Sequence, residues 1–133
     1  GKYSDLEVTS DDLSAMIIIF KNNVVGELHL DYFQRPDFKS CKIKGTKSTL
    51  YWDSTTNEVK LFSQKNKSWK SIYKLKNFDN NQMYVDELKH FFKCIKNNKK
   101  TINDIDDGIK TLKVVLSAKK SSESGNLITI NKK

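Results

Sequence analysis

The sequence predicts an α+β domain, an open and predominantly antiparallel (mixed) β-sheet with two helices packed on one face. Six short runs rich in β-branched and aromatic residues, divided by turn residues, fill the first 75 positions. From residue 82 onward the apolar spacing changes to that of a helix and continues through two segments. The length of 133 residues suits one core, so we expect a single domain over residues 1–133.

The strands are justified by their composition and by the turns between them. The first two runs, 13–21 and 24–32, flank Asn22 and Asn23, and asparagine tolerates the positive φ of a tight hairpin turn. Alternate residues from Val24 to Tyr32 are apolar or small, so one face of this hairpin should be core. The spacing of the later runs is typical of an antiparallel meander, with strands expected at 41–45, 49–53, 58–63 and 68–75.

Two helices should follow the strands. The first has an apolar stripe at i, i+4, i+7, i+8 and i+11, made of Tyr84, Leu88, Phe91, Phe92 and Ile95. The second is expected to start near Asn103 or Asp104, where carboxylates complement the helix dipole, and to stop at Gly125. Residues 127–130, LITI, are expected to form a last strand.

Charge and cysteine content limit the partners. The net charge is +8, but 23 of the 24 basic residues are lysines spread along the chain, which favours a solvated surface and no nucleic-acid partner. The alternative is a stand-alone polyanion-binding module that uses Trp52, Trp69 and Tyr73 beside the lysines. No apolar run has the roughly 20 residues of a membrane span. We expect a cytoplasmic protein without a membrane partner, in which Cys41 and Cys94 are semi-buried thiols.

Motifs for chemistry are missing from the sequence. The glycines, at positions 1, 26, 45, 108 and 125, cannot form G-x-G-x-x-G. His90 and Cys94 have helical spacing but lack a third ligand, so we expect no metal. The pairs Asp11–Asp12 and Asp106–Asp107 are interpreted as turn or cap residues, and GTKS at 45–48 as a hairpin turn. No catalytic, cofactor-binding or metal-binding residue is predicted in this chain.

Three passages resemble the C-terminal domain of the glucose-fructose oxidoreductase and inositol dehydrogenase (Gfo/Idh/MocA) family. They are DLSAMIIIFKNNVVGELHLDYFQRP, KIKGTKSTLYWD, and the tail from YVDELKHFF to GNLITI, and the resemblance runs from about Asp5 to Ile130. Ser48 departs from the pattern, because the family hairpin usually has a second glycine there. The family positions are occupied by Asp12, Gly45, Tyr84, Phe91, Phe92, Asp107, Gly108, Ser121 and Gly125.

The resemblance implies a glyceraldehyde-3-phosphate dehydrogenase-like C-terminal domain of an oxidoreductase. Such an enzyme would use NAD or NADP, held by an N-terminal Rossmann domain of the same polypeptide, and would act on a sugar, an inositol or a nucleotide sugar. We therefore expect these residues to be part of a longer protein and to be inactive alone. The resemblance also implies a homo-oligomer formed through the open face of the sheet.

Tyr32, Gln34 and Arg35 are the candidate substrate-binding residues. They follow the second strand, at the end that the resemblance places near the substrate cleft. Arg35 is the only arginine and Pro36 the only proline, and the proline biases Arg35 towards an extended conformation. An arginine can hold a carboxylate or phosphate with two donors. The alternative is a surface arginine stacked on Tyr32 or Phe33.

Overall fold

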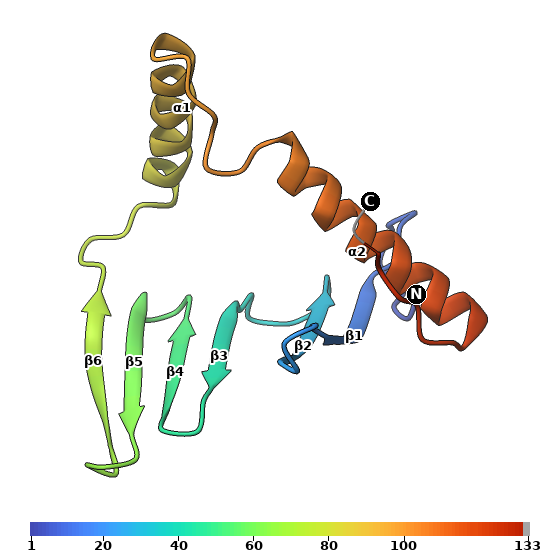
Figure 1. Cartoon of the computed structure of the whole chain (residues 1–133), viewed down its shortest axis with the longest axis horizontal. Coiled ribbons are helices and arrows are strands. Elements are labelled where there is room, and N and C mark those ends of the chain that lie inside the picture. Colours follow the sequence, from blue (N-terminus) through green and yellow to red (C-terminus); the bar gives the residue numbers. More distant parts are fainter. Residues whose placement is uncertain (132–133) are drawn as a thin grey trace. The chain divides into compact units, whose positions relative to one another are not determined.

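The computed structural model describes residues 1–131, and the chain divides into two compact units. The first unit, Gly1–Asp79, contains every strand, and the second starts at Asn80 and contains both helices (Figure 1). The predicted α+β class with open antiparallel sheets is confirmed. The assignment of the whole chain to one domain stays a prediction.

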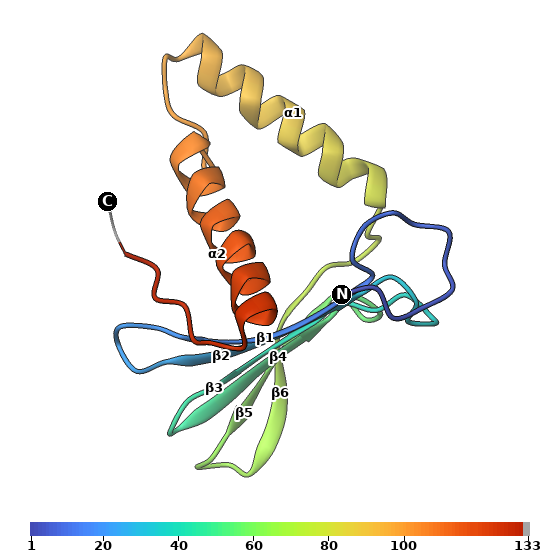
Figure 2. The ribbon, with the colours of Figure 1, turned by 90° about the vertical axis from the view of Figure 1, so that its right-hand side faces the viewer.

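The strands of the first unit form two sheets. Strands β1 and β2 make a two-stranded sheet, and β3, β4, β5 and β6 make a four-stranded sheet in sequential order. Every neighbouring pair is antiparallel, as the meander predicted, and Figure 2 shows the same strands from the side. The strands are β1 Leu13–Ile19, β2 Val25–Asp31, β3 Ser40–Lys44, β4 Ser48–Asp53, β5 Glu58–Ser63 and β6 Ser68–Lys74.

The single sheet expected from the sequence is thus interrupted after β2. Residues 32–39 form a loop between β2 and β3, and no ladder joins these two strands. Proline has no N–H to donate to a ladder, and Pro36 lies in the middle of this loop. The loop that breaks the sheet is the segment that carries the candidate substrate residues.

Asparagines with a positive φ lie in two of the hairpin turns. Asn23 has a φ of 62° between β1 and β2, and the Phe20 N–H donates to the Val24 carbonyl at 2.9 Å. Asn57, with a φ of 48°, ends the β4–β5 turn. Between β3 and β4 the Gly45 N–H donates to the Ser48 carbonyl at 2.9 Å, which confirms the hairpin interpretation of GTKS.

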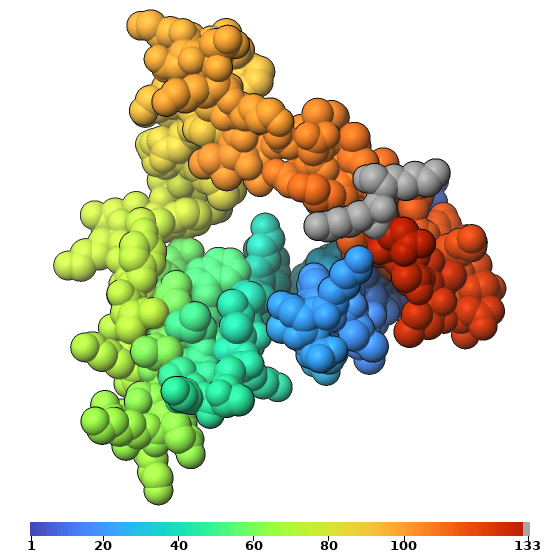
Figure 3. Space-filling view, in the orientation of Figure 1, coloured from blue at the N-terminus to red at the C-terminus, as the bar shows by residue number. Residues whose placement is uncertain are grey.

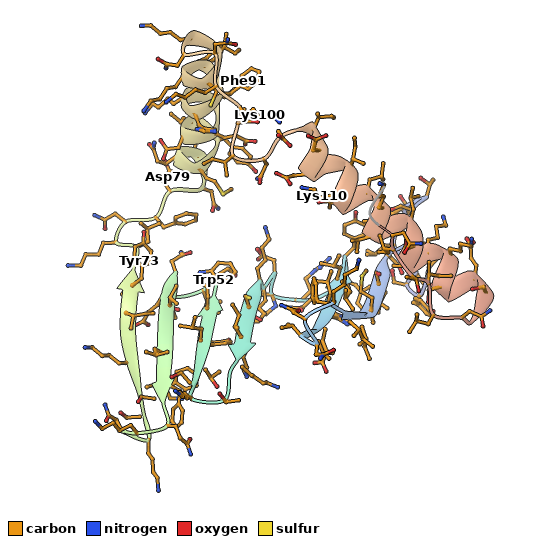
Figure 4. The ribbon with its side chains drawn as sticks, in the orientation of Figure 1. Trp52, Tyr73, Asp79, Phe91, Lys100 and Lys110 are labelled. Atoms are coloured by element: carbon orange, nitrogen blue, oxygen red, sulfur yellow. The ribbon has the colours of Figure 1, made fainter. Side chains whose placement is uncertain are left out.

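The register gives the four-stranded sheet two different faces. One, the apolar face, carries Cys41, Ile43, Leu50, Trp52, Val59, Leu61 and Tyr73. The other, the charged face, carries Lys42, Lys44, Tyr51, Asp53, Glu58, Lys60, Trp69 and Ser71. Figure 4 shows Trp52 and Tyr73 at the same end of the sheet, and Figure 3 shows the four strands, in green, as one group of side chains.

The second unit consists of α1, Asn80–Lys96, and α2, Ile105–Ser124. The predicted ends of α2 are confirmed. Asp104 is its N-cap and accepts the N–H groups of Asp106 and Asp107, and Gly125 is a left-handed C-cap with a φ of 67°. The predicted stripe of α1 forms, but its five side chains are exposed, from Tyr84 to Ile95.

Burial within residues 1–131 is limited to a few side chains. Counted over the whole residue, Cys94 is the buried apolar residue, and Asp12 and Asp53 are the buried acidic residues. Cys41 is exposed, so the expectation of two semi-buried thiols is wrong for both cysteines. Within the same residues, neither helix combines the length and the apolar character of a membrane span.

The prediction of a last strand at residues 127–130 is wrong. These residues have no regular secondary structure, and the Leu127 side chain is 76% exposed. A strand requires a partner strand, and the described part of the second unit contains only helices. The β-branched residues of LITI favour a strand, but they cannot supply the partner.

Candidate functional site

The candidate substrate residues lie in one loop directly after β2. Asp31 ends the strand, and its Oδ1 accepts the N–H groups of Phe33 at 3.1 Å and Gln34 at 2.6 Å. The Tyr32 N–H donates to the Asp12 carbonyl at 3.0 Å, which ties the start of the loop to the start of β1. The first residues of the loop are therefore anchored through their backbone N–H groups.

Arg35 is integrated into this loop through its guanidinium group. Its Nη1 donates to the Gln34 carbonyl at 2.9 Å and to the Tyr32 carbonyl at 3.1 Å. The peptide bond to Pro36 is cis. Within residues 1–131 the cation–π contact that the structure shows joins Lys42 to the Tyr51 ring, at 5.4 Å from its centroid, and does not involve Arg35. The guanidinium of Arg35 is thus bonded through Nη1 to the backbone carbonyls of the other two candidate residues, Tyr32 and Gln34.

Sequence reasoning missed Asp31 and His29. The Nε2 of His29 lies 3.0 Å from Asp31 Oδ2, so the two oxygens of Asp31 are shared between the loop backbone and the imidazole. A signal for Asp31 was present, because an aspartate at a strand end often accepts N–H groups two and three residues later. A signal for His29 was present too, because residues two apart in a strand share a face, and His29 and Asp31 both lie in β2.

Asp12 is a turn residue, as interpreted from the sequence. Its carboxylate accepts the N–H groups of Tyr3 at 2.6 Å and Ser4 at 2.9 Å, and the Ser4 hydroxyl at 2.6 Å. Burial raises the pKa of Asp12, but the hydrogen bonds from Ser4, Tyr3 and Lys2 outweigh it and hold the pKa well below its usual range. A carboxylate that stays ionised in this way fixes residues 1–4 against the start of β1 and does not serve as a proton donor.

A trough on the charged face has a volume of about 560 Å³. Trp69 lies edge-on to Tyr51, with ring centroids 6.4 Å apart, and half of its surface is exposed. A hydrogen bond from the Ser71 hydroxyl lowers the pKa of Glu58 and outweighs partial burial, which raises it. Lys60 forms an ion pair with Glu58 at 3.3 Å. The trough is lined by Lys42, Tyr51, Glu58, Lys60, Trp69 and Ser71.

His90 and Cys94 hold the loop between the helices. The Ile102 N–H donates to His90 Nε2 at 3.1 Å, and the Cys94 thiol donates to the Lys100 carbonyl at 3.3 Å. His90 is half-buried. Within residues 1–131 no three His, Cys, Asp or Glu side chains gather where they could hold a metal ion.

The match to a known family covers almost the whole chain. Residues 2–130 match the oxidoreductase family, C-terminal alpha/beta domain, of the Gfo/Idh/MocA group, and the chain belongs to this family. No curated protein and no solved structure matches the chain.

Several residues that carry the resemblance have structural roles. Asp12 fixes the entry to β1, and Gly45 closes the β3–β4 hairpin. At the end of α2 the Gly125 N–H donates to the Ser121 carbonyl at 2.9 Å, and the Ser121 hydroxyl donates to the Asn126 carbonyl at 2.6 Å. These family positions thus stabilise turns and helix ends of the fold.

Proposed function

We propose that the chain is the substrate-binding and assembly domain of an NAD(P)-dependent dehydrogenase that acts on a sugar, an inositol or a nucleotide sugar in the cytoplasm. The family match over residues 2–130 carries this proposal. Within the chain, the loop after β2 concentrates one guanidinium, one amide and one phenol in four consecutive residues. Such a set of donors suits a polyhydroxylated ligand with a negative group.

The cofactor would be held elsewhere in the whole protein. A dinucleotide site is built on parallel strands and a glycine-rich turn before a helix. Every strand pair within residues 1–131 is antiparallel, and the sequence has no G-x-G-x-x-G. The residues of this chain therefore do not fit NAD or NADP, and we assign the cofactor to an N-terminal Rossmann domain. This chain would bind and orient the substrate, and would be inactive alone.

Arg35 provides the test of substrate binding. In the full-length protein, Arg35→Lys keeps the charge but loses the planar pair of donors, so KM for an acidic sugar or nucleotide sugar should rise about tenfold or more. Neutral sugars should show unchanged kinetics. Lys39→Gln, which removes a nearby positive charge, is the control and should have little effect. Unchanged kinetics of the Arg35→Lys enzyme with every anionic substrate would remove Arg35 from the site.

The assembly part of the proposal concerns the four-stranded sheet. Large apolar side chains that stay exposed on a sheet favour a protein interface, and Ile43, Ile72 and Tyr73 are each more than half exposed. We assign the apolar face of this sheet to a contact with a second copy of the chain, in a symmetric pair. Sedimentation of the full-length protein should show a dimer or tetramer, and a monomer at high concentration would contradict the assignment.

The trough around Trp69 supports a second candidate function, the binding of a polyanion. Trp69 is half exposed beside Lys42 and Lys60, as a stacking platform requires. Trp52 and Tyr73 lie on the other face, however, so the three aromatic residues do not form one platform. Binding of single-stranded DNA that weakens steeply with salt would support this function, and no binding at low salt would end it.

A further inference from the structure

Asp31 is the residue around which the loop after β2 is built. Its side chain is only 7% exposed although it lies at a strand end. Three donors surround it, because Oδ1 accepts from Phe33 N–H and Gln34 N–H and Oδ2 faces His29 Nε2. A carboxylate held by three donors has little freedom and strongly constrains the backbone that it bonds.

The position of Arg35 depends on the same backbone. Gln34 is held at both ends, since its N–H donates to Asp31 and its carbonyl accepts from Arg35 Nη1 at 2.9 Å. The Tyr32 carbonyl accepts from the same nitrogen at 3.1 Å. If Asp31 lost its bonds to Phe33 and Gln34, the backbone that carries the two carbonyls would be less restrained, and the guanidinium that they orient would be less well fixed.

The negative charge of Asp31 is compatible with an anion bound at Arg35. An exposed aspartate four residues from the arginine would repel a negative ligand or pair with the guanidinium itself. Here both carboxylate oxygens are occupied by other donors and are shielded from solvent. The guanidinium bonds to backbone carbonyls instead and keeps its positive charge for a ligand.

We propose that Asp31 is a positioning residue that holds the loop so that Arg35 meets the carboxylate or phosphate of an anionic sugar substrate. This inference rests on the proposed function and deepens it, because it names the negative group as the feature that the site selects. Asp31 acts through the backbone of residues 32–35 and does not touch the substrate.

The experiment replaces Asp31 in the full-length protein by Ala, Ser and Asn. Alanine removes the acceptor, serine offers a weaker one, and asparagine keeps Oδ1 for the two backbone N–H groups. The probes are D-glucuronate for a carboxylate, inorganic phosphate for a phosphate, and D-glucose as an uncharged sugar, each measured by calorimetry. Asp37→Asn is the control, because it removes an equal charge from the same loop region.

The affinity for whichever anion binds the unchanged protein should fall about tenfold or more in Asp31→Ala, fall less in Asp31→Ser, and stay within about threefold in Asp31→Asn. Asp37→Asn and the response to D-glucose should not change. A thermal melt identifies any variant that fails to fold. If the alanine variant fails to fold, the anion affinities of the serine and asparagine variants can still be compared.

Two results would overturn the inference. Equal anion affinity across the folded Asp31 variants, together with a loss in Arg35→Lys, would show that Arg35 binds the anion without help from Asp31, and the proposed function would stand. If neither anion binds the unchanged protein, the anionic substrate is wrong and the role of Asp31 fails with it.

Discussion

Replacement by alanine should have opposite effects on stability at two glycines, one inside α2 and one at its C-terminal cap. Gly125 has a φ of 67° and a ψ of 12°, and a Cβ added there meets no atom within 4 Å. The cost of Gly125→Ala is therefore only that of the left-handed backbone, about 1–2 kcal/mol. Gly108 lies inside α2, where an added Cβ also meets nothing within 4 Å. Gly108→Ala should gain about 0.5–1 kcal/mol, because alanine is the better helix former.

The assay is urea unfolding of the full-length protein, followed by circular dichroism at a helix wavelength. With slopes of about 1–3 kcal/mol per molar urea, the two variants should differ in midpoint by roughly 1 M and lie on opposite sides of the unchanged protein. Gly125→Asn should lose less than Gly125→Ala, since asparagine tolerates the left-handed region. A midpoint of Gly125→Ala equal to or above that of the unchanged protein would refute the assignment of Gly125 as the helix stop.

Three further predictions follow from the described contacts. The pKa of Asp12 is lowered in the folded chain, so its contribution to stability is complete above the unfolded pKa of about 4 and is lost as the pH falls towards the folded pKa. The free energy of unfolding should therefore change less between pH 7 and pH 3 in Asp12→Asn than in the control Asp37→Asn. His90→Ala should speed hydrogen exchange of the Ile102 amide, whose acceptor it removes, and unchanged exchange would contradict that contact. Trp69→Ala should remove any salt-sensitive binding of single-stranded DNA, and binding that persists would place it outside the trough.

Local chemistry in the sequence predicted most of the fold. Each strand lies within two residues of its expected bounds, because alternation and turn residues are properties of short segments. Asp104 and Gly125 were found for the same reason, since a helix cap depends on a few neighbouring residues. The interruption of the sheet after β2 and the missing strand at 127–130 depend on which strands pair, and a local pattern does not contain that information.

Sequence reasoning found Arg35 of the candidate site but missed Asp31. Arg35 attracted notice as the only arginine, but sequence reasoning treated it as an isolated group. Asp31 seemed an ordinary polar residue of an alternating strand, although it organises the loop through three donors. A hydrogen bond from one carboxylate oxygen to two backbone N–H groups leaves only a weak mark in a sequence, because many strands end in an aspartate followed by a turn.

The structure also explains why this position suits an arginine in a chain of lysines. One nitrogen of the guanidinium, Nη1, donates to the carbonyls of Tyr32 and Gln34 and so is fixed in place by the loop. The remaining nitrogens lie in the same rigid plane, so fixing one of them also fixes the direction in which the others can donate. A lysine ammonium could reach the same carbonyls, but its remaining donors would sit on the same atom and could not extend a planar pair towards a carboxylate or phosphate. In the proposed site, the lone arginine is therefore both part of the loop and a donor to the anionic group of the substrate.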